Sequence, residues 1–327
     1  MSDKPIRVAV VGVGEFGRNH VRVWGELPGT ELVGIVDANA ERAKTVAAEF
    51  GTRVIPEIQS LAAEGVQAVS LAVPTKEHGR IGCRLLNAGL DVLVEKPVAA
   101  SVKEADELIA AASENRCILQ VGHVERFNPA VTAVQKVVSR PMFFEVHRLG
   151  IFTPRSLDID VVYDVMIHDL DIVLSLVHSA VIDLKAVGIP VMTDKVDIAQ
   201  ARIEFENGTV ANFTASRVST ERVRKMRFFQ EHEYVSLDFT RQDVLRVRVE
   251  SSGSQPEIKF EKVPTTPEEP LHGELRGFLE CVRSRRPPIV DGAAGRRALE
   301  LADRVMAATI EHAQRVQLGT FAPQEVR

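Results

Sequence analysis

The sequence predicts two consecutive domains, an α/β domain built on a parallel sheet and an α+β domain with a mainly antiparallel, open sheet. Three observations support this prediction. The chain has 327 residues, of which 45% are hydrophobic, and this length and composition suit two domains of ordinary size. Up to residue 123, short apolar runs alternate with helical patterns. From 124 to 327 closely spaced strand patterns dominate, so we place the boundary between 1–123 and 124–327.

The first domain is predicted from apolar runs that are separated by helix-like segments. The predicted strands are Ile6–Val11, Glu31–Val36, Ala68–Ala72, Asp91–Val94 and Ile118–Val121. Helical spacing in segments rich in Ala, Leu, Glu and Lys is found in Ala40–Phe50, Glu77–Ala88 and Val102–Glu114. Strands that alternate with helices imply a parallel sheet with helical crossovers.

The second domain combines many strand patterns with a few helices. The predicted strands are Met142–Ile151, Val196–Phe205, Thr209–Arg217, Lys225–Gln230, Glu233–Phe239 and Val244–Val249. The predicted helices are Val161–Val177, Pro270–Arg283 and Ala293–Val316. The run Glu206-Asn207-Gly208 favours a tight hairpin turn between two strands. These patterns predict an α+β domain whose sheet is mainly antiparallel.

Charge and composition exclude several classes of partner. Forty basic residues against forty-five acidic ones give a formal net charge of −5, which favours neither nucleic acid nor an anionic membrane. No stretch reaches the roughly 18 apolar residues of a membrane span, and the polar start of the chain does not resemble a signal peptide. The cysteines, Cys83, Cys117 and Cys281, have neither disulfide-framework nor zinc-site spacing. We therefore expect a cytoplasmic protein with a small-molecule partner.

The run Gly12-Val13-Gly14-Glu15-Phe16-Gly17 has the spacing G-x-G-x-x-G directly between a predicted strand and a helix. The first glycine permits a tight turn, the second lets the backbone approach a pyrophosphate, and the third lets helix and strand pack closely. The phosphates would then lie at the helix N-terminus. This motif predicts a Rossmann domain that binds a dinucleotide through Gly12, Val13, Gly14, Glu15, Phe16 and Gly17.

Asp37 ends the second predicted strand, 25 positions after Gly12. A carboxylate at this position accepts hydrogen bonds from the hydroxyl groups of the adenosine ribose and repels a 2′-phosphate. Arg42 nearby is a possible counterweight to that repulsion. We expect NAD as the cofactor in preference to NADP.

Three motifs carry a resemblance to a known family. Val73-Pro74-Thr75 is followed by His78, the next strand ends in Glu95-Lys96-Pro97, and Val121–Pro129 includes Arg126-Phe127 before a proline. In this order they resemble the glucose-fructose oxidoreductase and inositol dehydrogenase (Gfo/Idh/MocA) family. The resemblance implies that Lys96 is catalytic and faces the substrate. It also implies cofactor contacts from Pro74, Thr75, His78, Glu95, Lys96 and Pro97.

The same resemblance implies a second catalytic element, D-x-x-x-H, on the first helix of the second domain. Here it reads Asp164-Val165-Met166-Ile167-His168, and the i,i+4 spacing places both polar side chains on one helix face. Many relatives carry a glycine pair just before the aspartate, whereas this chain has Asp160-Val161-Val162-Tyr163, so we expect a different helix entrance. Asp169 and Asp171 add carboxylates, and the spacing of Asp164, His168 and Asp171 could suggest a metal site. The family generally needs no metal, and we expect none.

Oxidation of a secondary alcohol requires a base near the hydroxyl group while a hydride leaves the carbon atom. A neutral His168 suits this role near neutral pH, and a charged Lys96 stabilises negative charge on the oxygen. Asp164 would position the substrate and tune its neighbours. Lys96 itself as the immediate base remains an alternative, because burial and the charge of the cofactor can lower its pKa.

The run His147–Arg155 resembles a bacterial subgroup of this family, the UDP-N-acetylglucosamine 3-dehydrogenases. The segment Val124–Pro129 and the helix segment Asp164–Asp171 share this resemblance. Arg126, Arg148 and Arg155 are the predicted substrate-binding arginines, with a surface ion pair as the alternative for the last two. A free polyol or monosaccharide such as inositol is the alternative substrate. A non-enzymatic NAD or sugar sensor and a biliverdin-type reductase are the alternative functions. One sheet face left uncovered by helices predicts a homodimer or homotetramer.

Overall fold

The computed structural model describes residues 4–153, 159–252 and 255–317. The chain divides into two compact units, one made of 1–124 with 269–296 and the other of 125–268 with 297–327. The sequence predicts one continuous domain from 124 onward, so the structure differs in assigning 269–296 to the first unit. The reason is that the helix in this stretch packs its apolar side against the core of the first unit, next to Trp24.

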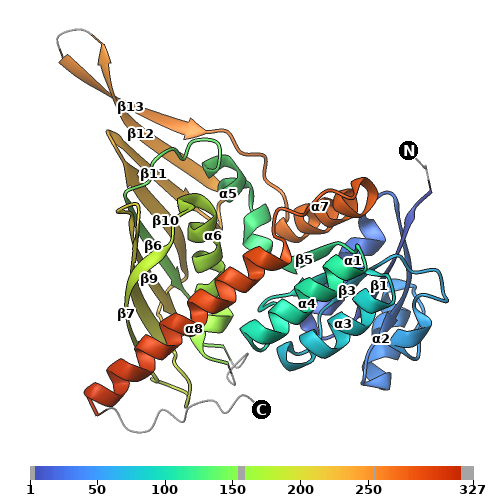
Figure 1. Cartoon of the computed structure of the whole chain (residues 1–327). Coiled ribbons are helices and arrows are strands. Elements are labelled where there is room, and N and C mark those ends of the chain that lie inside the picture. The colour runs from blue at the N-terminus through green and yellow to red at the C-terminus, as the bar shows by residue number, and fades with distance from the viewer. Residues whose placement is uncertain (1–3, 154–158, 253–254, 318–327) are drawn as a thin grey trace. The chain divides into compact units, whose positions relative to one another are not determined.

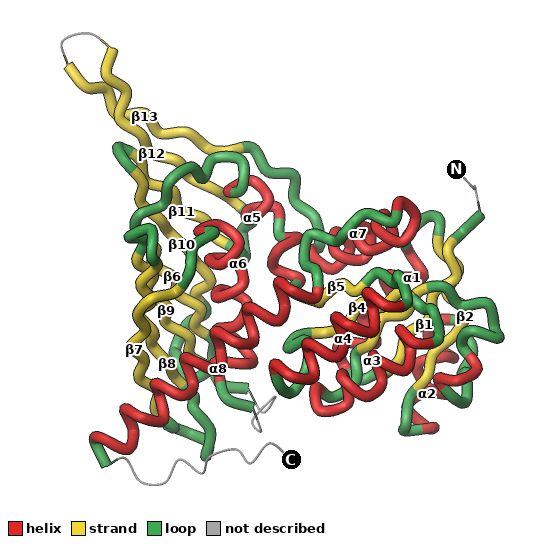
Figure 2. Tube along the Cα trace, in the orientation of Figure 1, coloured by secondary structure: helices red, strands yellow, loops and turns green. Residues whose placement is uncertain are grey.

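The first unit contains a five-stranded parallel sheet (Figures 1 and 2). Its strands are β1 (Ile6–Val11), β2 (Thr30–Val36), β3 (Ala68–Leu71), β4 (Asp91–Glu95) and β5 (Leu119–Gly122). They lie in the order β2-β1-β3-β4-β5 and every pairing is parallel. On the outer edge of β2, Ile35 forms an isolated parallel bridge with Val54. A sixth strand of a Rossmann sheet would lie at this edge. The predicted α/β class is therefore confirmed.

Helices cover both faces of this sheet. They are α1 (Glu15–Glu26), α2 (Ala40–Phe50), α3 (His78–Asn87), α4 (Val102–Glu114) and α7 (Pro270–Ser284), with short 3-10 turns η1 (Ile58–Ser60) and η2 (Thr75–Glu77). The apolar sides of α1, α2 and α7 share one core cluster, in which Trp24 and Phe278 lie with ring centroids 6.4 Å apart. On the other face α3 packs against α4, where Gly82 lies close to Leu108. Alternating side chains of the strands thus reach both helical layers.

The second unit contains an eight-stranded sheet in the order β13-β12-β11-β10-β6-β9-β8-β7. Its strands are β6 (Phe143–Leu149), β7 (Val181–Ile189), β8 (Ile198–Phe205), β9 (Val210–Ser216), β10 (Val223–Gln230), β11 (Glu233–Asp238), β12 (Asp243–Ser252) and β13 (Gln255–Val263). All pairings are antiparallel except that of β6 with β9. The mainly antiparallel sheet is confirmed, and Gly208, at φ +86°, forms the predicted turn between β8 and β9.

Two strands of this sheet, β7 and β13, were not predicted. Both lie at its edges, where charged residues alternate with exposed apolar ones such as Ile182 and Phe260. An edge strand has little buried surface and tolerates charges, and β13 accordingly alternates charged with apolar residues. The residues of β7, Val181–Ile189, are mostly apolar, and this signal was overlooked. The alternation in Ile258-Lys259-Phe260 was nevertheless a usable signal for β13.

The helices of the second unit are η3 (Val124–Phe127), which starts at the end of the first unit, then α5 (Pro129–Val134), α6 (Ile167–Val177) and most of α8 (Gly292–Arg315). A π-helical turn, η4 (Val162–Met166), precedes α6. The helix expected over Val161–Val177 is therefore present, but Val162–Met166 are π-helical instead of α-helical. Such π turns occur often at functional sites because they redirect side chains within a helix.

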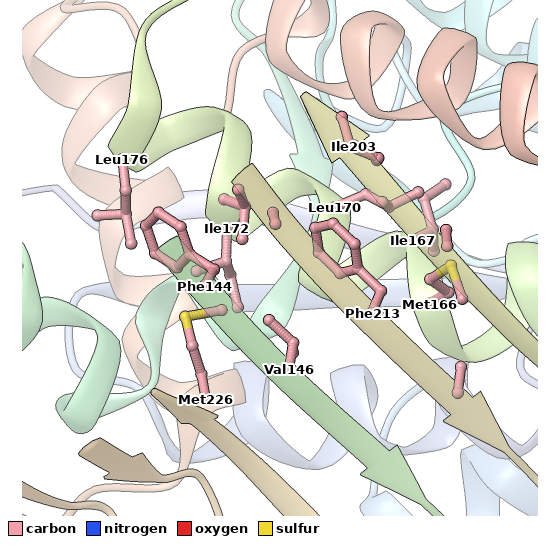
Figure 3. Packing of buried hydrophobic residues seen from close by; sticks show 14 of the residues in the cluster. Phe144, Val146, Met166, Ile167, Leu170, Ile172, Leu176, Ile203, Phe213 and Met226 are labelled. Atoms are coloured by element: carbon pink, nitrogen blue, oxygen red, sulfur yellow. The ribbon is translucent and has the colours of Figure 1, made fainter. Parts of the chain in front are cut away.

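The core of the second unit lies between one face of its sheet and the helices α5, α6 and α8. Figure 3 shows this packing, with Phe144 and Met226 from the sheet beside Ile172 and Leu176 of α6. The rings of Phe144 and Phe228 have centroids 5.3 Å apart. Burial of this face fixes the position of α6 on the sheet. Within the described ranges, no helix is long and apolar enough to cross a membrane.

Candidate active site

The predicted phosphate loop connects β1 to α1. Gly12 has φ +85°, and a Cβ atom there would lie 2.6 Å from the carbonyl oxygen of Ala72, so only glycine fits without strain. A Cβ on Gly17 would lie 1.8 Å from the carbonyl oxygen of Gly12, which explains the third glycine. Around Gly14, by contrast, no described atom outside Gly14 and its two chain neighbours lies within 4 Å of such a Cβ.

Gly14 also caps α1, and its missing side chain leaves the first N–H groups of this 12-residue helix without a side-chain cap. Open space in front of a helix N-terminus, bordered by closely packed glycines, fits the pyrophosphate of a dinucleotide. Glu15 and Phe16 begin the helix, and Phe16 is 63% exposed. The loop as built therefore fits the predicted cofactor.

Asp37 follows β2, and its side chain is only 2% exposed. One carboxylate oxygen accepts the backbone N–H of Val13 at 2.8 Å, and the other accepts that of Asn39 at 2.7 Å. Arg42 donates to both oxygens, at 3.1 and 2.7 Å. Burial alone would raise the pKa of Asp37, but these hydrogen bonds outweigh it and hold the pKa below its usual range. Asp37 therefore links the phosphate loop to the expected ribose position as an anion.

Pro74 and Thr75 form the turn after β3, and His78 begins α3 directly behind them. The imidazole of His78 is 1% exposed and lies 2.9 Å from two carbonyl oxygens, those of Val73 and Pro97. Burial lowers its pKa, against the opposing effect of both carbonyls. His78 is therefore buried, and its two contacts connect the turn that follows β3 to the turn that follows β4.

Glu95 and Lys96 lie at the carboxyl end of β4, where ligands of parallel sheets bind. The peptide bond between Lys96 and Pro97 is cis. Glu95 Oε1 is 2.9 Å from His20 Nε2, and Glu95 Oε2 accepts the backbone N–H of Lys96 at 3.3 Å. Burial tends to raise the pKa of Glu95, but the hydrogen bond from His20 and nearby positive charge hold it below its usual range.

In the second unit, Asp164 lies within η4 and His168 in the first turn of α6. Both side chains are partly exposed, whereas Met166 and Ile167 between them are buried in the core. Side-chain hydrogen bonds help to hold the helix entrance that departs from the family pattern. Asp160 accepts the backbone N–H of Val196 at 2.8 Å. The hydroxyl group of Tyr163 donates to Asp303 at 2.8 Å.

A buried ionic network fixes the start of α6 on the sheet. Arg148 of β6 donates two hydrogen bonds to Asp169, at 2.9 and 2.7 Å, and a third to Glu125 at 2.6 Å. Its guanidinium group also lies 4.6 Å from the ring centroid of Phe239. The neighbouring carboxylates raise the pKa of Arg148 despite its burial. Asp169 directly follows His168, so this network positions the helix turn that carries the imidazole.

The other predicted arginines have different surroundings. Arg126 is 8% exposed and lies 3.4 Å from both carboxylate oxygens of Asp171. Arg155 lies outside the described residues. Sequence reasoning missed the supporting roles of Glu125, Asp169 and His20, because their partners are 21 to 75 positions away. The acidic run Asp169–Asp171 next to the predicted His168 was the one signal that pointed to a network.

Comparison with known families matches both units. The family described as "Oxidoreductase family, NAD-binding Rossmann fold" matches residues 6–123, and "GFO/IDH/MocA C-terminal domain" matches residues 131–235. These two matches cover most of the chain. They include both the phosphate loop and the D-x-x-x-H segment described above.

Known relatives extend this result over nearly the whole chain. A UDP-N-acetylglucosamine 3-dehydrogenase of Acidithiobacillus ferrooxidans is 40% identical over 95% of this chain and 99% of its own. The solved structure of that enzyme has a TM-score of 0.87 and covers 93% of this chain and 97% of its own. A scyllo-inositol 2-dehydrogenase (NAD(+)) of Bacillus subtilis is 28% identical over 87% of this chain and 88% of its own. With its phosphate loop, its E-K-P turn and matches over both units, this chain belongs to the Gfo/Idh/MocA family of NAD-binding oxidoreductases.

Proposed function

We propose that this enzyme is a cytoplasmic, NAD-dependent dehydrogenase that oxidises the 3-hydroxyl group of UDP-N-acetylglucosamine to a ketone. The observation that carries the proposal is the 40% identity, over 95% of the chain, to an enzyme of that name. Lys96, Asp164 and His168 support it, because the chain retains both polar elements that alcohol oxidation requires. A regulator that only binds NAD or sugar would have no need for them.

When bound, the nicotinamide would accept the hydride. We assign to His168 the removal of the hydroxyl proton, and to Lys96 the stabilisation of negative charge on the same oxygen. Asp164, one π-helical turn before His168, positions the substrate. Lys96 as the immediate base remains the alternative, and the double variant described in the Discussion tests whether the two residues act in one step.

The preference for NAD rests on Asp37. Its buried carboxylate remains an anion, which opposes a 2′-phosphate and favours ribose hydroxyl groups. Arg42 partly neutralises this charge through two hydrogen bonds. NAD is therefore the proposed cofactor, with a preference that Arg42 reduces.

Arg126, Arg148 and Arg155 remain the proposed substrate-binding arginines. The three hydrogen bonds of Arg148 to carboxylates support an indirect role for it, in which it fixes the start of α6. Arg126 faces one carboxylate at the longer distance of 3.4 Å, which leaves donors for a phosphate group.

We also propose a homodimer or homotetramer assembled through the open face of the eight-stranded sheet. Across five neighbouring strands, this face carries a row of paired residues, Phe143, Phe229, Tyr234, Val247 and Phe260. The first three rings lie 5.8 and 5.2 Å apart, and Phe260 is 73% exposed. A contiguous apolar row on a sheet favours association. A monomer at micromolar concentration, measured by light scattering, would contradict this.

The function is tested with the purified protein by following absorbance of the reduced cofactor. NAD with UDP-N-acetylglucosamine is the expected active pair, and NADP is the cofactor comparison. N-acetylglucosamine tests the need for the nucleotide, and UDP-glucose tests the need for the acetamido group. Inositol tests whether the enzyme prefers a polyol to the sugar. Higher kcat/KM with inositol than with any sugar nucleotide would reject the proposed substrate in favour of the polyol. NAD binding without turnover on any of these would favour a sensor.

A further inference from the structure

A cluster of buried polar side chains lies behind the E-K-P turn, within the first unit. It consists of six residues from five elements: His20 and Trp24 of α1, Ser70 of β3, Glu95 of β4, Gln120 of β5 and Glu274 of α7. Five of them are at most 1% exposed, and the side chain of Glu95 is 15% exposed. Neither the phosphate loop nor the proposed proton transfer makes use of this cluster. One of its atoms, Glu95 Oε2, nevertheless accepts the backbone N–H of Lys96.

A chain of hydrogen bonds leads from Trp24 to Glu95. Trp24 Nε1 donates to Ser70 Oγ at 2.8 Å, and Ser70 Oγ lies 3.1 Å from His20 Nδ1. His20 Nε2 then lies 2.9 Å from Glu95 Oε1. Nε2 faces a carboxylate, which accepts hydrogen bonds. Nε2 therefore carries a proton whether the imidazole ring is neutral or charged. His20 therefore donates to one oxygen of Glu95.

Glu274 has no such donor. Its side chain is 0% exposed, and among the described residues neither of its carboxylate oxygens has a hydrogen-bond partner. Gln120 donates only to its backbone oxygen, at 3.3 Å. One ligand atom each of Glu274, Glu95 and His20 lie within 4.8 Å of one another. An ionised Glu274 would thus be a second buried anion beside Glu95, which is very costly.

The protonation of the two carboxyl groups differs for physical reasons. Burial raises the pKa of Glu274 well above its usual value, and the negative charge of Glu95 raises it further. Burial also tends to raise the pKa of Glu95. The hydrogen bond from His20 and the charges of His20, Lys96 and His78 outweigh this effect and lower the pKa. Two neighbouring carboxyl groups whose pKa values are pushed apart divide into one acid and one anion.

We propose that Glu274 is a positioning residue that stays protonated at neutral pH and donates its proton in a hydrogen bond to the Glu95 carboxylate. Glu95 is then held from two sides, by His20 and by Glu274, while its Oε2 atom accepts the backbone N–H of Lys96. Glu274 thereby fixes the turn that presents Lys96. The expected effect of Glu274 on turnover rests on the proposed function. The protonation of Glu274 does not depend on that function.

The same three side chains could in principle bind a metal ion. The hydrogen bond from His20 to Glu95 favours the shared proton, because a nitrogen atom that carries a proton has no lone pair for a metal. Metal analysis of the purified protein therefore decides between the two. Stoichiometric metal that is lost in Glu274→Gln would overturn the proposal.

The proton is tested by comparing wild type with Glu274→Gln, which keeps a donor but cannot ionise. In heavy water at neutral pH, the wild type should show an infrared band of a protonated carboxylic acid that the variant lacks. Since the folded pKa of Glu274 is raised, the wild type loses stability as pH rises above the unfolded value of 4.5. The melting temperature of the variant relative to wild type should therefore increase between about pH 5 and pH 8. A constant difference together with no lost band would overturn the proposal.

The positioning role is tested by adding Glu274→Leu, which has similar volume and no donor. This variant should lower kcat by up to about 100-fold through misplacement of Lys96, with KM for NAD changed much less. Glu274→Gln should restore most of kcat. Equal kcat in wild type and Glu274→Leu, or equal loss in both variants, would overturn the positioning role. If no substrate supports turnover or the Leu variant does not fold, the infrared and melting experiments still decide the protonation.

Discussion

The two units of this enzyme hold their predicted site residues in different ways. In the first unit, the predicted cofactor site consists mainly of backbone groups and strand ends, with Gly12, Gly14 and Gly17 within six residues of one another. In the second unit, the helix that carries His168 is held by a network of buried charges centred on Arg148. This difference shows that a site formed by backbone groups can be predicted from a short motif in the sequence. A site made of side chains depends on partners far away in the chain.

The largest expected effect tests whether residues from both units serve one chemical step. Lys96→Met and His168→Ala should each lower turnover by on the order of 10²–10⁴, because each removes one member of a proton-transfer pair. NAD binding, measured by calorimetry, should remain nearly unchanged. The double variant should lose much less than the product of the single losses.

Matched controls for these variants are Lys103→Met and His232→Ala, whose side chains are 87% and 77% exposed. Both controls should retain wild-type turnover. If the two site variants also retain it on the true substrate, the catalytic assignment is wrong.

The second prediction concerns the charge network of the second unit. Arg148→Met should destabilise the protein by about 3–5 kcal/mol, because it leaves the carboxylates of Glu125 and Asp169 buried without their counterion. Lys44→Ala, which breaks an ion pair exposed by 69% and 83%, should cost less than about 1 kcal/mol. Urea unfolding of both variants measures the contrast. Similar losses would show that burial of the Arg148 network contributes little.

The third prediction separates the glycines of the phosphate loop. Gly14→Ala should leave stability within about 0.5 kcal/mol, because its Cβ meets open space. It should weaken NAD binding by about tenfold or more, equivalent to at least ~1.4 kcal/mol. Gly12→Ala should instead destabilise the folded protein by more than about 1 kcal/mol, since its φ is +85°. Calorimetric titration with NAD and thermal unfolding distinguish the two outcomes, and equal effects on both quantities would refute the distinction.

The smallest expected effect concerns cofactor preference. Asp37→Ser should reduce the preference for NAD over NADP by about 1 kcal/mol, roughly fivefold, through loss of one charged acceptor near the ribose. Glu41→Gln, at a neighbouring side chain that is 83% exposed, should leave the preference unchanged. The ratio of kcat/KM values for the two cofactors measures both. Equal affinities for NAD and NADP in the unmodified protein would count against the assignment of Asp37.

Much of the fold could be predicted because its signals are local. The strand Ile6–Val11 and the turn at Gly208 follow directly from apolar runs and glycine spacing. The return of α7 to the first unit could not be predicted, because an amphipathic helix does not specify which sheet it covers. The π-helical turn before α6 also escaped prediction, since its sequence Val162-Tyr163-Asp164-Val165-Met166 suits an ordinary helix.

The same distinction holds for the candidate site. Lys96 and His168 could be proposed from the sequence because each lies within a short recognisable motif. Neither Glu274 nor the structural role of Asp169 could be inferred from the sequence, because both depend on burial beside another charge. A buried carboxyl group looks like any surface glutamate or aspartate in sequence until its neighbours are known.

The position of α7 in the chain has a consequence for synthesis on the ribosome. The first unit begins with β1 but is completed by residues 269–296, which emerge only after the entire sheet of the second unit. Until then, the nascent Rossmann sheet lacks the partner of Trp24, namely Phe278, and the carboxyl group of Glu274. Helix α7 thus completes the first unit late in synthesis, and a nascent chain that ends before Pro270 leaves apolar surface that invites chaperone binding. Completion of the first unit is thereby coupled to translation of the second.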